Sequence, residues 1–355
     1  MILALNKELA GFDMDSCLLS INNYRSERQH LHDAAVAETQ AAVLLPCRSR
    51  FDTDTLKALR EEIVRRKARV LHVHDYKSAF YAILASRKLH VPIVATVHGW
   101  VNSSLSLRIY NRIEVAIMRR FDALIVVAES QIQRLLGAGL PRKRIHRIDN
   151  GIGIPARDGS ATPLSRAALG IPEDAYLFAA VGRLAPEKNL ALLLEAFAVQ
   201  SARAPGSFLM LVGDGPDRAA LESQAASLGL DGKILFTGNR DDVQAIYPLI
   251  DCLVMPSLSE GMPLVILEAM SHGIPIVASA VGEIPRLLSH TRTGRIVPPA
   301  ELAPLEAAMR AAMEAPPGRD EGAREYVRRH HSSRAMASKY AEIYRMLMNE
   351  GRHVG

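Results

Sequence analysis

The 355-residue chain has few cysteines, and their scarcity limits the kinds of site that it can carry. Its three cysteines, Cys17, Cys47 and Cys252, are scattered, and no two of them have the spacing of a metal-binding pair. An odd number of isolated cysteines is typical of proteins that fold in a reducing compartment. We therefore expect a cytoplasmic protein without a metal site.

Long hydrophobic runs and nucleic-acid-binding patterns are also missing. No apolar segment approaches the ~18 residues of a transmembrane helix. Residues 1–5 pass directly into the polar residues 6–8, so we expect no secretory signal peptide. Aromatic residues make up 5 % of the chain, and no helix-turn-helix, zinc finger or aromatic-rich basic platform is visible. The sequence therefore predicts no binding of nucleic acid.

Positive charge is in excess, with a formal net charge of +5, and it is concentrated in the first half of the chain. The clusters are Arg65-Arg66-Lys67, Arg108 and Arg112, Arg119-Arg120, and Arg142-Lys143-Arg144. Two interpretations stay open. The clusters can be solvated helix faces, or they can contact an anionic membrane surface or a lipid-diphosphate acceptor.

Hydrophobic residues are abundant, at 48 % of the chain, and they recur in alternating strand and helix patterns. A chain of this length is long for one core, so two domains are expected. Strands that alternate with helices predict parallel sheets. A segment rich in Gly, Pro, Ala and Ser at 151–173 reads as the linker. The predicted divisions are 1–155, 156–330 and a closing helix within 331–355.

The expected elements follow from apolar periodicity. Strands are expected at 15–21, 43–46, 70–74, 93–98, 123–127, 145–148, 176–182, 208–212, 234–236, 252–255, 276–278 and 294–297. Helices are expected at 54–67, 78–88, 104–120, 130–136, 189–199, 217–228, 243–250, 263–272, 284–288, 304–315 and 332–348.

The most informative segment is 257–270, in which seven residues separate Glu260 from Glu268. Pro263 suits the first turn of a helix, and Gly261 allows close approach of a ligand to the backbone. Free N–H groups at a helix start bind phosphate. A fully helical step of eight residues rises about 12 Å, which is too far for two carboxylates to share one anomeric carbon. The spacing suits two carboxylates at opposite ends of an extended ligand.

This segment resembles the Glu-x7-Glu motif of retaining, nucleotide-sugar-dependent glycosyltransferases of the family 4 type. Further matching segments follow in the expected order over roughly residues 1–345: 96–99 (TVHG), 181–189 (VGRLAPEKN), 211–216 (LVGDGP) and 236–239 (FTGN). The resemblance implies the glycosyltransferase-B architecture, in which two Rossmann-like, doubly wound α/β domains face a cleft. It also implies that the first domain serves the acceptor, that the second binds the nucleotide sugar, and that the last helix crosses back to the first domain.

The resemblance implies a role for each charged residue of the site. Arg183 and Lys188, just after the first strand of the second domain, would stabilise a leaving diphosphate. Glu268 would accept hydrogen bonds from the ribose hydroxyls, while Glu260 would contact the transferred sugar. His98 would bond to the donor or line the acceptor cleft. The donor would be a UDP- or GDP-sugar, and no metal or other cofactor is expected.

The remaining expected contacts with the donor are made by backbone groups. After Glu260 they come from Gly261, Met262 and Leu264, beside Pro263, which cannot donate. At the strand ends they come from Gly182, Gly213, Gly238 and Asn239. Gly213 begins a partial dinucleotide fingerprint, but Arg218 replaces its third glycine, so we reject an NAD site.

A metal site at His72, His74 and Asp75 is a weak reading of the strand at 70–74. His72 and His74 share one face of that strand, and Asp75 follows at its tip. Asp75 and Tyr76 fit an acceptor cleft better.

The start of the chain departs from the family pattern. A first strand and a glycine-rich loop are expected before the first helix, yet Met1 falls inside that helix. The missing strand would be central in the sheet. Either the strand at 15–21 pairs directly with that at 70–74, or the first domain is loose and the form impaired.

Three functions stay open. The first is a retaining transferase acting on a glycan or lipid-linked acceptor in cell-surface polysaccharide or glycoconjugate synthesis. The second is a truncated, non-catalytic nucleotide-sugar-binding remnant. The third is a related two-domain epimerase or phosphorylase. Release of free nucleotide only in the presence of acceptor would favour the first.

Overall fold

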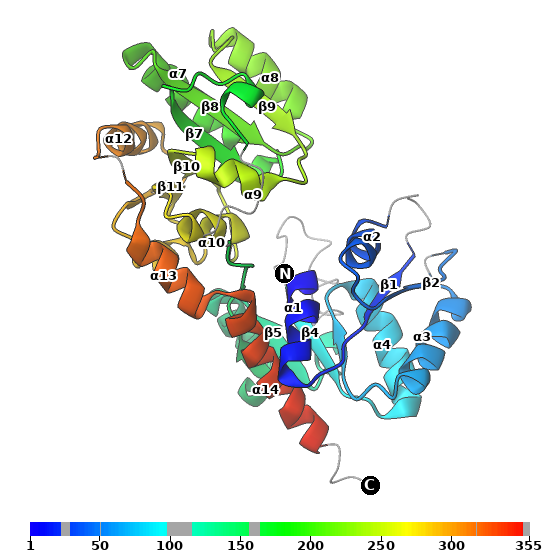
Figure 1. Ribbon diagram of the computed structural model, residues 1–355. Coiled ribbons are helices and arrows are strands. Elements are labelled where there is room, and N and C mark those ends of the chain that lie inside the picture. Colours follow the sequence, from blue (N-terminus) through cyan, green and yellow to red (C-terminus); the bar gives the residue numbers. More distant parts are fainter. Residues whose placement is uncertain (23–28, 50, 98–115, 156–163, 317, 351–355) are drawn as a thin grey trace. The chain divides into compact units, whose positions relative to one another are not determined.

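The structure is a computed structural model that describes residues 1–355 except 23–28, 50, 98–115, 156–163, 317 and 351–355 (Figure 1). The chain divides into two compact units. One comprises Met1–Gly151 together with Ser333–Gly355, and the other comprises Ile152–Ser332. The last helix therefore belongs to the same unit as the N-terminal half.

The first unit is an α/β layer structure. Its strands are β1 (Leu18–Ile21), β2 (Ala42–Leu45), β3 (Leu71–Val73), β4 (Ile93–Val97), β5 (Ala123–Val126) and β6 (Ile145–Arg147). Its helices are α1 (Ile2–Leu9), α2 (His30–Ala37), α3 (Thr53–Arg65), α4 (Tyr76–Leu89), α6 (Glu129–Gly137) and α14 (Ser333–Glu350). All the strand pairs are parallel, as the alternation of strands and helices predicts. Every residue of β4 and β5 is buried, which is typical of parallel strands covered on both faces.

The strands of the first unit form two sheets, β1-β2 and β3-β4-β5-β6. Among the described strands, β1 pairs with β2 and does not pair with β3. Direct pairing of the strand at 15–21 with that at 70–74 was therefore wrong. The two sheets are instead joined through side chains, because Leu19 and Ile21 pack against the core cluster that contains Leu71 and Val73.

Helices α1 and α14 cover one face of the four-stranded sheet. Leu5 and Leu9 of α1 share a buried cluster with Tyr340 and Tyr344 of α14 and with Ile125 of β5. Polar contacts add specificity to this layer. The Nδ1 atom of His72 lies 2.6 Å from the Tyr344 hydroxyl, and its Nε2 atom lies 2.8 Å from the Thr96 hydroxyl.

The second unit is built on one six-stranded parallel sheet in the order β12-β11-β10-β7-β8-β9. Its strands are β7 (Tyr176–Val181), β8 (Ser207–Val212), β9 (Ile234–Gly238), β10 (Cys252–Met255), β11 (Ile276–Ser279) and β12 (Gly294–Val297). Its helices are α7 (Leu190–Arg203), α8 (Arg218–Ser227), α9 (Val243–Ile246), α10 (Leu264–Ser271), α11 (Ile284–Leu288), α12 (Leu302–Met313) and α13 (Glu321–His330). Helices α7, α8 and α12 pack their apolar sides on the cluster that includes Phe178, Leu209 and Val254.

Two helices of the structure were not predicted from the sequence. Helix α13 is strongly polar, and its buried residues are the small Ala323 and Val327, so few apolar side chains mark it in the sequence. Helix α2 buries Ala35. The basic helix expected at 104–120 lies mostly outside the described residues. No helix in the described part of the chain combines the length and apolarity needed to cross a membrane.

Candidate functional site

The residues expected to bind the donor lie at the carboxyl ends of the strands in the second unit. Strand β7 lies between β10 and β8. The chain adds β8 and β9 on one side of β7 and then crosses to add β10, β11 and β12 on its other side. Open α/β sheets bind their ligands at such a switch point, beyond the carboxyl ends of the strands. The loops after β7 and β10 both lie there.

Glycines let the loops after β7, β8 and β9 pack backbone against backbone. Gly182 has φ of 139° and Gly213 has φ of 131°. A Cβ atom on Gly213 would lie 2.0 Å from the Gly182 carbonyl oxygen, so a side chain cannot be accommodated. The Gly213 N–H donates to the Gly238 carbonyl oxygen at 2.9 Å. The predicted donor-side residues Gly182, Gly213 and Gly238 are therefore brought together.

The loops after β7 and β10 are tied by an ion pair. The Nζ atom of Lys188 lies 2.6 Å from Oε1 of Glu260, and the Leu258 N–H donates to the Glu187 carbonyl oxygen at 2.8 Å. Ser257, which is fully buried, donates its hydroxyl to the same Glu260 oxygen at 2.7 Å. The predicted residues Lys188 and Glu260 are thus direct neighbours.

A small pocket opens at this junction. Its lining includes Gly182, Arg183 and Lys188 from the β7 side, and Pro256 and Ser257 from the β10 side. Arg183 is exposed, and within the described residues it makes no ion pair or side-chain hydrogen bond. Two cations therefore border the pocket, one engaged by a carboxylate and the other open to solvent.

Helix α10 starts one residue later than predicted. Pro263 has an extended backbone and occupies the N-cap position, and the helix runs from Leu264 to Ser271. Residues 257–263 are not helical, so the fully helical rise considered for the two glutamates does not apply. The loop after β11 packs closely against the Glu260 backbone, because a Cβ atom on Gly282 would lie 2.2 Å from the Glu260 carbonyl oxygen. The Glu283 N–H donates to the Gly261 carbonyl oxygen at 2.9 Å.

Glu268 lies on α10 and is half-buried. Its Oε2 atom accepts a hydrogen bond of 2.5 Å from the hydroxyl of Tyr247, which is fully buried. Burial and the neighbouring Glu268 carboxylate raise the pKa of Tyr247 far above its ordinary value, so the phenol stays a donor. Neither Ser257 nor Tyr247 was predicted. Ser257 lies three residues before Glu260, which is a local signal, but Tyr247 lies 21 residues before Glu268, and no spacing rule connects them.

Two of the other predicted positions, His98 and Asp75, belong to the first half of the chain. His98 lies outside the described residues. Asp75 caps the start of α4, accepting from the N–H groups of Lys77 and Ser78, which accounts for its position at a strand tip. Over the described residues, no group of three or more His, Cys, Asp or Glu side chains is arranged to hold a metal ion.

Both halves of the chain match models of known families. A family described as Glycosyltransferase Family 4 matches residues 2–154, and one described as Glycosyl transferases group 1 matches residues 162–330. These matches correspond to the two α/β units in sequence order.

Named relatives are similar over most of the chain. Glycogen synthase of Mycobacterium tuberculosis is 30 % identical over 293 residues, which are 78 % of this chain and 68 % of the relative. The UDP-Gal:alpha-D-GlcNAc-diphosphoundecaprenol alpha-1,3-galactosyltransferase of Escherichia coli is 30 % identical over 65 % of this chain. The alignments cover 62 % of that galactosyltransferase and 56 % of a relative from Bacillus subtilis, so the chain spans less than two thirds of these two relatives.

The fold is that of solved glycosyltransferase-B structures. Anabaena Alr3699/HepE in complex with UDP and glucose superposes with a TM-score of 0.78 at 20 % identity, covering 96 % of this chain and 94 % of the other. The predicted architecture of two Rossmann-like domains is therefore confirmed.

Proposed function

The chain belongs to the glycosyltransferase family described by these two matches, and on that premise we propose that it moves a sugar from a UDP- or GDP-sugar to a glycan or lipid-linked acceptor, with retention at the anomeric carbon. The observation that carries the proposal is the meeting of Lys188, Arg183 and Glu260 at the switch point of the sheet. One relative is a galactosyltransferase named for UDP-Gal, and Anabaena Alr3699/HepE has a structure in complex with UDP-glucose, which supports a nucleotide-sugar donor.

In the proposed reaction the bond between the anomeric carbon and the diphosphate breaks, and the acceptor oxygen bonds to the same face of the sugar. The acceptor proton passes to the departing phosphate oxygen. Arg183 and Lys188 neutralise the charge that grows on the diphosphate, which is electrostatic stabilisation in the transition state. These two cations supply that charge, and the proposal includes no metal.

Glu260 and Glu268 divide the donor between them. Glu268 binds the ribose, and Glu260 contacts the transferred sugar. The Gly182, Gly213 and Gly238 loops, with Asn239, border the nucleotide through backbone groups. The N–H groups of Gly261, Met262 and Leu264 face the phosphates and sugar at the start of α10. Because Lys188 forms an ion pair with Glu260, the diphosphate must compete with the Glu260 carboxylate for this cation.

A turnover assay tests the proposal. The protein is incubated with UDP-glucose, UDP-galactose or GDP-mannose, with and without a bacterial lipid-linked oligosaccharide fraction, and free UDP or GDP is measured. Acceptor-dependent release that Lys188→Ala abolishes supports the transferase. Donor binding without release in any acceptor fraction would favour the non-catalytic remnant, and release of UDP or GDP without acceptor would favour neither.

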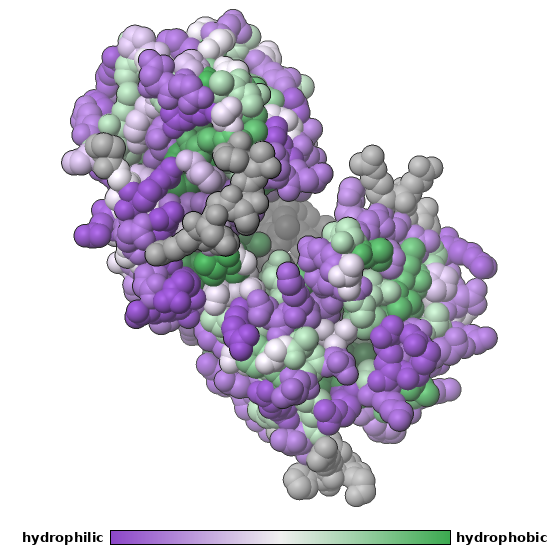
Figure 2. All heavy atoms as spheres, in the orientation of Figure 1, coloured by the Kyte–Doolittle hydropathy of each residue, from purple (hydrophilic) through white to green (hydrophobic). Residues whose placement is uncertain are grey.

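The proposed location is the cytoplasm, at the inner face of the plasma membrane, in cell-surface polysaccharide or glycoconjugate synthesis. Two basic clusters of the first unit come together, because the Arg144 guanidinium donates to the Arg119 carbonyl oxygen at 3.1 Å. Arg119, Arg120, Arg142 and Lys143 are exposed. Hydrophilic residues cover much of the face of this unit seen in Figure 2.

Co-sedimentation tests this membrane contact. Binding to anionic vesicles at low salt that fades at high salt supports it. Equal binding to neutral vesicles would return these residues to the role of solvated surface.

A further inference from the structure

A buried tyrosine holds the carboxylate that the proposed function assigns to the ribose. Tyr247 and Glu268 come from different elements: Tyr247 begins the short 3-10 turn Tyr247–Leu249 before β10, and Glu268 lies on α10. The hydroxyl of Tyr247 donates to Oε2 of Glu268 at 2.5 Å. Oε1 of Glu268 makes no hydrogen bond to the described residues. One oxygen of the carboxylate is thus engaged by the protein.

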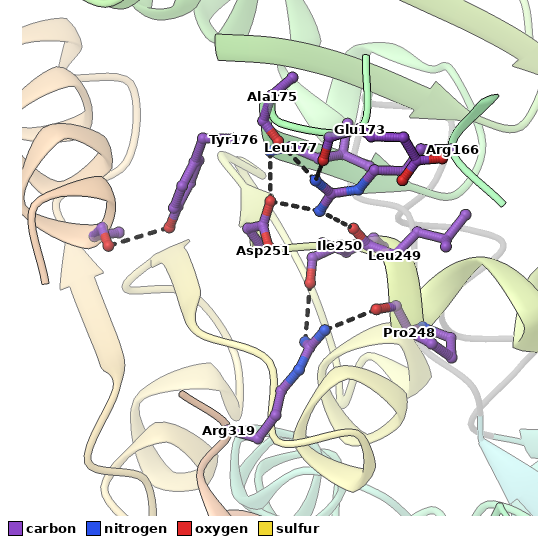
Figure 3. Close-up of polar contacts among 11 residues, drawn as sticks. Arg166, Glu173, Ala175, Tyr176, Leu177, Pro248, Leu249, Ile250, Asp251 and Arg319 are labelled. Atoms are coloured by element: carbon purple, nitrogen blue, oxygen red, sulfur yellow. Dashed lines mark hydrogen bonds and ion pairs between the residues drawn. The ribbon is translucent and has the colours of Figure 1, made fainter. Parts of the chain in front are cut away.

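The backbone after Tyr247 is braced by two arginines, which Figure 3 shows converging on one loop. Arg319 donates to the carbonyl oxygens of Pro248 and Ile250 at 2.8 and 2.9 Å. Arg166 donates to the Leu249 carbonyl oxygen at 2.7 Å. Each of the three carbonyl groups that follow Tyr247 therefore accepts from a guanidinium, so this turn has little freedom to move its phenol.

The loop is also tied to the first residues of β7. Arg166 donates to Oδ2 of Asp251 at 2.7 Å, and the same oxygen accepts from the Leu177 N–H of β7 at 2.8 Å (Figure 3). The loop that carries Tyr247 and the start of β7 are therefore held together.

The ring of Tyr247 is fixed from its other side by the helix that carries Glu268. His272 follows α10, and its imidazole stacks on the Tyr247 ring with centroids 5.3 Å apart. Burial, and the nearby Arg324 and Arg319, lower the pKa of His272 to about 4, so the stacking partner is neutral at neutral pH. The phenol thus contacts α10 at both Glu268 and His272.

A site in which a glutamate accepts hydrogen bonds from a vicinal diol binds that diol more weakly when the glutamate side chain samples several rotamers. A hydrogen bond to one carboxylate oxygen removes that freedom and directs the other oxygen outward. We propose that Tyr247 is a positioning residue that orients Glu268 toward the ribose diol of the donor nucleotide and thereby sets the preference of the site for ribonucleotides over 2′-deoxyribonucleotides. This inference rests on the proposed function, because it takes Glu268 as the ribose ligand.

The test compares two pairs of probes by calorimetry: UDP with 2′-deoxy-UDP, and GDP with 2′-deoxy-GDP. Tyr247→Phe keeps the ring and removes the hydroxyl. It should weaken binding of the preferred ribonucleotide by about 10-fold, the size expected for a hydrogen bond to a charged group. Binding of the 2′-deoxy analogue, which offers Glu268 only the 3′-hydroxyl, should weaken less, so the ribose preference narrows. An unchanged preference would overturn the inference.

Tyr176→Phe is the matched control. The Tyr176 hydroxyl donates at 3.1 Å to the carbonyl oxygen of Ala312, which belongs to α12 of the same unit and not to α10. This variant loses a tyrosine hydrogen bond and should keep the wild-type ribose preference. A preference lost equally in both variants would show a general loosening of the unit and would overturn the positioning role.

Two Glu268 variants separate this inference from the proposed function. If Glu268→Ala leaves ribonucleotide binding unchanged, the ribose assignment itself is wrong. If Glu268→Ala weakens binding but Tyr247→Phe does not alter the preference, the positioning role alone is wrong. If Tyr247→Phe does not fold, Glu268→Asp takes its place in the test. This variant keeps the carboxylate charge but moves it away from the Tyr247 hydroxyl by the length of one methylene. An undiminished ribose preference in Glu268→Asp would then overturn the inference.

Discussion

The ammonium group of Lys188 and the carboxylate of Glu260 form an ion pair with an N···O distance of 2.6 Å, joining the loops after β7 and β10. Their side chains are 22 % and 10 % exposed, so the pair is largely shielded from water. Glu260 therefore neutralises the charge of Lys188. If Lys188 binds the donor diphosphate as proposed, the diphosphate must replace the Glu260 carboxylate or share Lys188 with it.

Substitution of either cation should reduce turnover far more than stability. We expect Lys188→Ala and Arg183→Ala each to lower turnover on the order of 10²-fold, as for removal of one oxyanion donor. Arg203→Ala, which breaks an exposed ion pair with Glu306, is the control and should turn over normally. Donor turnover at saturation and thermal melts provide the measurement. Normal turnover in the Lys188/Arg183 double variant would refute the role.

Ser257→Ala should impair Glu260 without unfolding the protein. The variant removes a buried hydrogen bond of 2.7 Å to the Glu260 carboxylate. We expect turnover to fall about 3- to 10-fold, which corresponds to the usual net free energy of one hydrogen bond. Ser201→Ala removes a buried serine hydroxyl that bonds within α7, and it should leave turnover unchanged. Equal effects of the two variants would argue against a role for Ser257 at Glu260.

Gly282→Ala should displace the Glu260–Gly261 peptide. Gly282 and Gly229 both have left-handed backbones, with φ of 56° and 68°. A Cβ atom on Gly282 meets the Glu260 carbonyl oxygen at 2.2 Å, whereas one on Gly229 meets nothing within 4 Å. In both variants the alanine must adopt a left-handed backbone, which lowers the free energy of unfolding by about 1–2 kcal/mol. Only Gly282→Ala should also lose turnover. Turnover and melting temperature of the two variants, measured side by side, decide the point.

The second unit should become less stable as the pH falls from 6.5 toward 4. The pKa of His272 is lowered to about 4 from its ordinary 6.5, chiefly by burial. As the pH falls, His272 is therefore protonated in the unfolded chain before it is protonated in the folded one. The resulting loss in the free energy of unfolding grows to at most about 3 kcal/mol. His272→Leu removes this one contribution. Urea titrations at several pH values should show a shallower loss below pH 6.5 in the variant, and parallel curves would contradict the assignment.

Much of the second unit could be predicted from its sequence. Apolar runs such as Phe208–Val212 are long and are bounded by glycine or proline, and the Lys188 and Glu260 motifs follow directly on strands. Roles for single residues were implied by the resemblance to a known family. The contact between Lys188 and Glu260, 72 residues apart, depends on the strand order, which spacing does not encode.

The first unit was less predictable. Its short helix α2 shows little apolar period, and the separate β1-β2 sheet is held by side-chain packing. Asp75 followed a strand in the same way as a ligand residue would, yet it caps a helix. The sequence pattern alone does not distinguish a cap from a ligand, since both require an oxygen acceptor at a strand tip.

We propose that Glu268 binds the nucleotide, whereas Glu260 acts on the sugar and competes with the diphosphate for Lys188. Calorimetry with UDP and GDP, paired with donor turnover, tests it in Glu268→Ala and Glu260→Ala. We predict that Glu268→Ala weakens binding of the free nucleotide by roughly 10-fold or more. Glu260→Ala should bind the nucleotide as tightly as the wild type or more tightly, because it frees Lys188, and yet lose turnover. Equal weakening of nucleotide binding by both substitutions would contradict the account.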